Sequence, residues 1–167
     1  MINHLERIAF LDGQILTDVH LNKMQKNIAE SLKDKTTRER YDMLMLVSPY
    51  NYYTYDSFID ESKKDNLSTA KLDNLRYMIS EDEWIAKIVE LPEQSEEAYI
   101  LSDYEKDQNN ESSIDFYYRI SEGNEWTKVE ADTPIYMPRT SYFQLKIHCR
   151  YEGSTRPAVY DYAVMFK

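Results

Sequence analysis

Few side chains in this sequence have the types and the spacing that catalysis needs. The three histidines are His4, His20 and His148, and no two of them stand four residues apart or within a carboxylate motif typical of a metal site. The sequence also lacks a Gly-x-Ser-x-Gly elbow, a Walker loop and a dinucleotide-binding fingerprint. We therefore expect no enzymatic activity, no cofactor and no bound metal.

The single cysteine, Cys149, stands on the apolar side of an alternating strand pattern. A nucleophilic role would need a histidine beside it in space, which the sequence does not identify, so a thiol buried in the core is the favoured interpretation. With no second cysteine, a disulfide scaffold is excluded, and a reducing place of synthesis such as a cytoplasm fits more easily.

Carboxylates gather in two stretches, which span residues 56–65 and 103–111. Paired carboxylates can hydrolyse glycosides when they stand about 5–9 Å apart. The spacing here matches no calcium loop, and solvated acidic loops are the usual meaning of such runs, with weak Ca²⁺ binding as the alternative. The net charge of −10 would repel a phosphate backbone, so nucleic acid is an unlikely partner.

An amphipathic helix of about 16 residues is predicted near the N-terminus, with Thr17 or Asp18 as its N-cap. Its apolar positions recur at spacings of three and four and are Leu21, Met24, Ile28 and Leu32. Such a short helix is marginal alone, so the stripe must pack on something, either within this chain or on another subunit. We treat the stripe as a candidate protein interface.

Residues 35–66 are expected to connect this segment, residues 1–34, to the rest of the chain. Lys33 to Arg40 is interpreted as a polar connection, and the apolar run Tyr41–Val47 could be either a buried strand or a helical turn. A cluster of aromatic residues follows: Tyr50, Tyr52, Tyr53, Tyr55 and Phe58. It could pack as an edge strand and loop, form an aromatic docking surface, or offer a platform for sugars.

From about Leu67 the pattern changes to alternation with period two. About eight short strands are expected, among them 114–120 and 143–151, and Glu122-Gly123-Asn124 predicts a hairpin turn. Short strands at regular intervals, with no helical pattern among them, indicate an antiparallel β-sandwich of the jelly-roll or galactose-binding type over residues 67–167. The predicted fold class is mainly β with a short N-terminal α-helix.

The last predicted strand, 159–166, has apolar residues on both faces. Tyr160, Tyr162, Val164 and Phe166 would share one face, while Val159, Ala163 and Met165 would share the other. A free-standing sandwich should keep one face of its strand wet, so the second face should be covered by the N-terminal segment or by a neighbouring subunit. We expect Val159, Ala163 and Met165 to form an interface.

Two stretches resemble proteins of tailed bacteriophages. Residues 10–22, which contain Gly13-Gln14-Ile15-Leu16-Thr17 and Leu21-Asn22, are similar to the opening of many tail and baseplate proteins. Residues 114–129, followed by 143–150 and a tyrosine-rich terminal strand, are similar to strands of tail sandwich domains, although the usual Asp-Gly-Gly turn is here Glu122-Gly123-Asn124.

The resemblance implies a structural protein of the virion tail, assembled in the host cytoplasm, that links arm, fibre or receptor-binding subunits to the baseplate. Its partners would be other tail proteins, in a homo- or hetero-oligomer. The N-terminus has no signal-peptide pattern and the chain no apolar run of about 18 residues, so neither secretion by a cleaved signal nor membrane insertion is expected. The alternative from another class is a carbohydrate-binding module for host cell-wall glycan, with Tyr50, Tyr52, Tyr53, Tyr55 or Trp84 as stacking platforms; a glycosidase has little support.

Overall fold

A computed structural model describes residues 18–73, 78–79, 82–106, 112–151 and 156–167, and for residues 18–21 and 78–79 it describes the backbone only. The described part holds one helix, α1, and eight strands. The helix spans Asp18–Val47. The strands are β1 (Tyr52–Asp56), β2 (Met78–Ile79), β3 (Glu83–Ile85), β4 (Val89–Glu105), β5 (Ser112–Arg119), β6 (Thr127–Val129), β7 (Pro134–Tyr151) and β8 (Ala158–Phe166).

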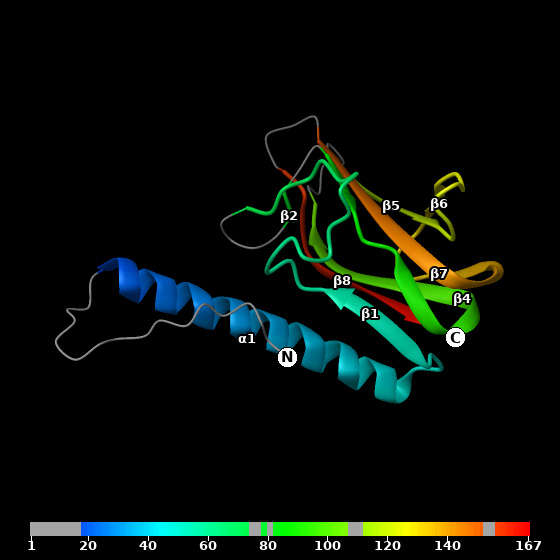
Figure 1. The fold of residues 1–167 in the computed structure, drawn as a ribbon, viewed down its shortest axis with the longest axis horizontal. Coiled ribbons are helices and arrows are strands. Elements are labelled where there is room, and N and C mark those ends of the chain that lie inside the picture. The colour runs from blue at the N-terminus through cyan, green and yellow to red at the C-terminus, as the bar shows by residue number, and fades with distance from the viewer. Residues whose placement is uncertain (1–17, 74–77, 80–81, 107–111, 152–155) are drawn as a thin grey trace.

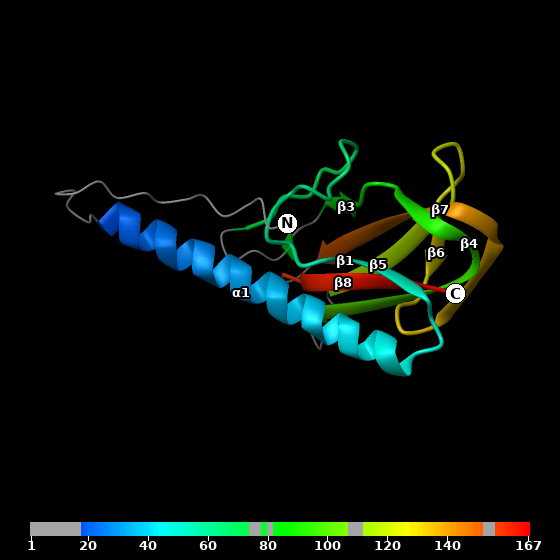
Figure 2. The same cartoon turned by 60° about the horizontal axis from the view of Figure 1, so that its bottom comes forward.

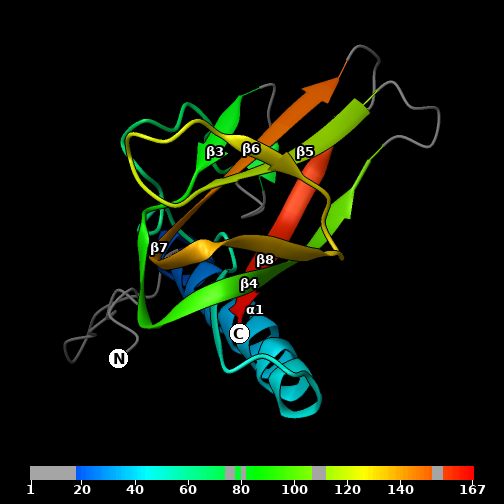
Figure 3. The same ribbon diagram turned by 90° about the vertical axis from the view of Figure 1, so that its right-hand side faces the viewer.

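The strands form an antiparallel β-sandwich, as the sequence predicts. One layer contains β1, β8, β2, β4 and the first half of β7, and the other contains β3, β5, β6 and the second half of β7 (Figure 1). Figure 3 shows the change of direction that carries β7 from one layer to the other. The strand order along the hydrogen-bonded path is β1-β8-β4-β7-β5-β6. The mainly β fold class with an N-terminal helix is therefore confirmed.

The core of the sandwich is rich in aromatic rings that meet between the layers. Phe58 and Trp84 are fully buried and pack edge to face, with ring centroids 4.9 Å apart. Phe143 packs edge to face against Phe166 at 5.1 Å and stacks on Tyr118 at 5.6 Å. Cys149 is fully buried in the same core, which agrees with the expected core thiol.

The predicted hairpin is present between β5 and β6. The two strands pair antiparallel, with Phe116 opposite Val129 and Tyr118 opposite Thr127. The backbone N–H of Asn124 donates to the carbonyl of Ser121 at 3.2 Å, inside the turn that joins them. Glu122-Gly123-Asn124 thus forms the turn that joins the two strands.

Two predicted boundaries are wrong. α1 is 30 residues long and includes the stretch from Lys33 to Arg40, which is therefore not a connection. The ambiguous run Tyr41–Val47 forms about the last two turns of this helix. No glycine or proline interrupts these residues, and ion pairs at i, i+4 join Lys35 to Glu39 and Arg38 to Asp42. The helix ends where Pro49 follows Ser48, because a residue before proline avoids the helical conformation.

The strand boundary predicted at Leu67 is also displaced. β1 lies before it and pairs with β8, with Tyr52 opposite Phe166 and Asp56 opposite Tyr162. Phe58 then enters the core with a positive φ of 52°. Residues 52–58 therefore belong to the sandwich and not to a connecting segment.

Candidate protein-docking surface on α1

The second half of α1 packs on the outer face of the layer that holds β1, β8 and β4 (Figures 1 and 2). Tyr41 is 1% exposed and lies in a small apolar cluster with Ala163 and Met165 of β8. Partly buried residues complete this cluster: Met45, Tyr50, Tyr53, Tyr55, Tyr99 and Leu101. The helix thus covers the second apolar face of β8 from within the same chain.

A polar clasp around Asp161 fixes the helix on this face. Asp161 is 4% exposed, and its Oδ1 accepts a hydrogen bond from the Tyr41 hydroxyl at 2.6 Å and an ion-paired one from Arg40. Burial, with the Asp161 charge second, raises the pKa of Tyr41 well above its ordinary value, so the hydroxyl stays protonated and donates. The one charged residue inside the apolar strand β8 is therefore satisfied by α1.

Further hydrogen bonds run along the same helix face. Asp34 Oδ1 accepts from the Ser57 hydroxyl at 2.7 Å and from the Tyr55 hydroxyl at 3.3 Å, and Asp42 Oδ1 accepts from the Tyr53 hydroxyl at 2.5 Å. The docked residues Asp34, Thr37, Tyr41 and Met45 recur at spacings of three, four and four. That periodicity was available in the sequence, but two of its four members are polar and a search for apolar stripes passes over them.

The opposite face of α1 carries an exposed apolar stripe. Leu32 stands nine residues before Tyr41, which is about two and a half helical turns and places it on the far side of the helix from the sandwich. The exposed fractions are 37% for Met24, 57% for Ile28, 58% for Leu32, 70% for Met43, 85% for Leu46 and 84% for Val47. We call these six residues the outer stripe. None of Met24, Ile28 and Leu32 is buried against the part of the chain that the structure describes, and the side chain of Leu21 lies outside the described residues.

The first turns of α1 also extend past the sandwich (Figures 1 and 2). The buried positions on the helix are Thr37 and Tyr41, and no residue described before Thr37 is buried. Monomeric proteins seldom expose large apolar patches, and such patches mark contact sites for proteins. Among the described residues, the outer stripe is therefore the strongest candidate for a protein-binding surface.

The interface predicted at Val159, Ala163 and Met165 is divided by a β-bulge. Asp103 pairs with Asp161 but Tyr104 pairs with Val159, which leaves Tyr160 as an extra residue in β8. Val159 consequently turns into the sandwich core, where it is fully buried, and its assignment to the interface is wrong. Ala163 and Met165 do share the other face, but the contact they make is with α1.

The four tyrosines predicted as an aromatic surface do not share one face. Because β1 alternates, Tyr53 and Tyr55 point toward α1, whereas Tyr52 packs against the sandwich core and stacks with Phe166 at 6.0 Å. Tyr50 packs against Tyr99, with ring centroids 5.7 Å apart. The described contacts thus favour packing for Tyr50, Tyr53 and Tyr55, and Trp84, which is fully buried, offers no stacking surface.

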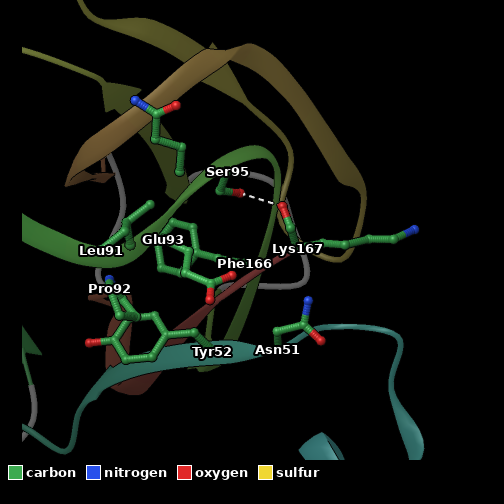
Figure 4. Close-up of a pocket in the computed structure, with 9 residues that line it drawn as sticks. Asn51, Tyr52, Leu91, Pro92, Glu93, Ser95, Phe166 and Lys167 are labelled. Atoms are coloured by element: carbon green, nitrogen blue, oxygen red, sulfur yellow. Dashed lines mark hydrogen bonds between the residues drawn. The ribbon is translucent and has the colours of Figure 1, made fainter.

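A small pocket lies at one end of the sandwich, beside Tyr52 (Figure 4). Its volume is about 330 Å³, and a hydrogen bond of 2.7 Å from the Ser95 hydroxyl to the Lys167 carbonyl closes one side. It is lined by Asn51, Tyr52, Leu91, Pro92, Glu93, Gln94, Ser95, Phe166 and Lys167. Two aromatic rings, Tyr52 and Phe166, beside amide and charged groups could hold a small polar ligand.

The remaining residues with possible chemistry are held in structural roles. Burial raises the pKa of the Cys149 thiol to about 12, which leaves it un-ionised and weakly nucleophilic at neutral pH. Within the described ranges no three His, Cys, Asp or Glu side chains gather closely enough to hold a metal ion. In the same part of the chain, no helix combines the length and the apolar composition needed to cross a membrane.

Among the described residues, Asp56 is a buried carboxylate with a strongly raised pKa. It is 3% exposed, its Oδ1 accepts from the backbone N–H of Phe58 at 2.9 Å, and burial raises its pKa to about 6. This hydrogen bond holds the turn in which Phe58 takes its positive φ. Asp56 therefore stabilises the turn at the end of β1.

No protein-family model matches the chain, and a search of curated proteins finds no match to it.

Proposed function

We propose that this protein is a structural adaptor of a tailed-phage tail or baseplate, which the outer stripe of α1 attaches to a protein neighbour. The observation that carries the proposal is the row of six exposed apolar side chains on the face of α1 that points away from the sandwich. Burying one such side chain fully contributes about 1.5–3 kcal/mol before the costs of ordering are subtracted. The phage assignment rests on the resemblance of residues 10–22 and 114–129.

The arrangement of the chain suits this role. The sandwich has an aromatic core, and α1 is held to it by the hydrogen bond and ion pair that Tyr41 and Arg40 make with Asp161. The half of α1 that carries Met24, Ile28 and Leu32 is left available to a neighbour. A partner that buried this half would be fixed relative to the sandwich, as a linker between virion parts requires.

Deleting residues 1–33 tests the proposal. This truncation removes the first half of the outer stripe but keeps Asp34 and all residues that pack on the sandwich, so the truncated protein should still unfold in one cooperative transition. In phage particles that carry the gene, immunoblots of purified virions should detect the full-length protein and not the truncated one. Absence of the full-length protein from purified tails would refute the phage role.

A second candidate is the carbohydrate-binding module, and the pocket beside Tyr52 is the observation that favours it. Tyr52 is half-buried, and Asn51, Glu93 and Gln94 place polar groups around it. Glycan-array binding that is lost in Tyr52→Ala, while the Tyr99→Ala control still binds, would support this function. An array without a signal for the wild-type protein would refute it.

A further inference from the structure

The outer stripe is not apolar throughout, and its polar centre suggests what covers it. Between Leu32 and Met43 the same side of the helix carries Lys35 and Glu39, whose side chains are 70% and 62% exposed. The positions 24, 28, 32, 35, 39, 43 and 46 follow one another at spacings of three and four, so they stay on one side of a nearly straight helix. Lys35 and Glu39 form an exposed i, i+4 ion pair with each other, with Nζ and Oε1 3.7 Å apart. A surface that offers apolar groups at both ends and one charge of each sign in the middle would match this stripe and could share the pair.

A second copy of α1 meets this requirement when it runs antiparallel. With the two-fold axis near residue 37, Lys35 of each helix faces Glu39 of the other, and Leu32 of each helix faces Met43 of the other. Ile28 then lies beside Leu46 and Val47 of the second copy. Two symmetric ion pairs are thus flanked on both sides by apolar contacts, which is the self-complementary pattern of a two-fold interface.

A parallel pair of the same helices lacks this complementarity. Each residue would then lie beside its own copy, so the middle of the contact would place Lys35 near Lys35 and Glu39 near Glu39. Like charges at facing positions are unfavourable. The sequence of the stripe therefore favours the antiparallel direction.

The rest of the molecule leaves room for the pairing. Tyr41 and the sandwich lie on the other side of α1, so the two sandwiches would sit on the outer sides of the helix pair. The overlap from Ile28 to Val47 covers 20 residues, or about 30 Å of helix. α1 carries six basic and five acidic side chains, so two helices with a net charge of +1 each can approach without the repulsion expected from a chain of net charge −10.

We propose that the protein forms a two-fold dimer in which the outer stripes of two α1 helices pack antiparallel, with Lys35 of each copy paired to Glu39 of the other. The proposal rests on the proposed function, since it names a second copy of this chain as the neighbour of the stripe. It is tested on the full-length chain by sedimentation equilibrium over a range of concentrations. The wild-type protein is expected to show a reversible monomer–dimer equilibrium.

Stripe variants test which surface pairs. The double variant Ile28→Glu/Leu32→Glu should be monomeric, because four added carboxylates would be buried in the contact. The matched control Asn22→Glu/Lys26→Gln changes the net charge by the same amount at exposed helix positions away from the stripe, and it should dimerise as the wild type does. Equal dimerisation of both variants would overturn the proposal.

Charge exchange tests the polar centre. Lys35→Glu and Glu39→Lys should each weaken dimerisation by about tenfold, because two ion pairs become two like-charge contacts. The double variant Lys35→Glu/Glu39→Lys should restore it. The Lys35–Glu39 ion pair inside each helix is lost and restored in the same way, so helix content must be shown equal by circular dichroism. A double variant as weak as the single variants would refute the pairing.

Disulfide trapping tests the direction. Mixed Leu32→Cys and Met43→Cys proteins should form a disulfide between the two variants, whereas Leu32→Cys alone should form none, because its two copies lie 11 residues apart, or about 16 Å. The native Cys149 is fully buried and does not compete. A disulfide in Leu32→Cys alone would indicate parallel helices and overturn the proposal. A monomeric wild type that still enters phage particles through the stripe would overturn the dimer and leave the adaptor function standing.

Discussion

Tyr41→Ala should separate α1 from the sandwich. The ring of Tyr41 is 1% exposed and packs among Ala163, Met165, Tyr53 and Tyr55, and its hydroxyl donates to Asp161 at 2.6 Å. Removing a buried ring costs about 1.5–3 kcal/mol of transfer free energy, and a hydrogen bond to a charged acceptor adds about 1.5–3 kcal/mol. The sum of about 3–6 kcal/mol agrees with the ~3–5 kcal/mol that truncation of a buried aromatic residue to Ala usually costs.

The structure sets an upper limit on the loss of stability in Tyr41→Ala. Once the cost exceeds the free energy that holds α1 on the sandwich, the helix detaches and the sandwich remains folded. Urea unfolding followed by tryptophan fluorescence would report the sandwich, because Trp84 lies in its core. Hydrogen exchange at residues 38–47 would report the helix.

We expect fast exchange at residues 38–47 of Tyr41→Ala and a smaller decrease in the free energy of unfolding of the sandwich. The control Met43→Ala lies two residues away at a position that is 70% exposed, and it should change the stability by less than about 0.5 kcal/mol. Unchanged hydrogen exchange in Tyr41→Ala would show that the aromatic and polar contacts of Tyr41 do not hold the helix.

Three further variants test other parts of the structure. Asp56→Asn should stabilise the protein at pH 7 by up to about 3 kcal/mol, because the folded state raises the pKa of Asp56 from 3.8 to about 6. The protonated carboxyl stabilises the native wild type fully below pH 3.8, and this stabilisation is lost as the pH rises through 6. The urea midpoint of the wild type should therefore fall between about pH 4 and 7, and that of the variant should not. Cys149→Ala should lower the free energy of unfolding by about 1–2 kcal/mol without altering assembly, and loss of assembly in a folded variant would contradict its role as a core residue. Ala163→Lys/Met165→Lys should expose α1 to protease while the sandwich stays folded, because two ammonium groups would displace the helix. A helix that remains protected from protease would contradict the contact between α1 and this face and favour the intersubunit contact expected from the sequence.

The sequence predicted the fold class well because most strands keep one wet and one buried face. Residues 116–119 of β5 show this alternation, and the hairpin after the strand was predicted at the right residues. β4 and β7 are longer than the short strands expected, and they run through Pro92 and Pro138, which lie near their N-terminal ends. In a sandwich with bent strands such residues sit at the bend, where the register shifts.

The candidate site was predicted in part. The residues Met24, Ile28 and Leu32 were identified by their spacing, but spacing alone does not say whether an apolar stripe faces the chain's own core. The docked face of α1 includes two polar residues, Asp34 and the buried Thr37. The partners of Asp34, Ser57 and Tyr55, are known only once β1 is placed. The bulge at Tyr160 likewise depends on pairing with β4 and reverses the side of Val159 without any local signal.

The unbroken course of α1 has a mechanical consequence. Its free half and its docked half belong to one helix of 30 residues, about 45 Å long, without a glycine or proline at which it could bend. A load applied near Leu32 would therefore reach Tyr41 and Asp161 as torque, with the outer turns as the arm of a lever. The strength with which those two residues hold the helix would then decide how much force the protein transmits between its neighbours before it yields.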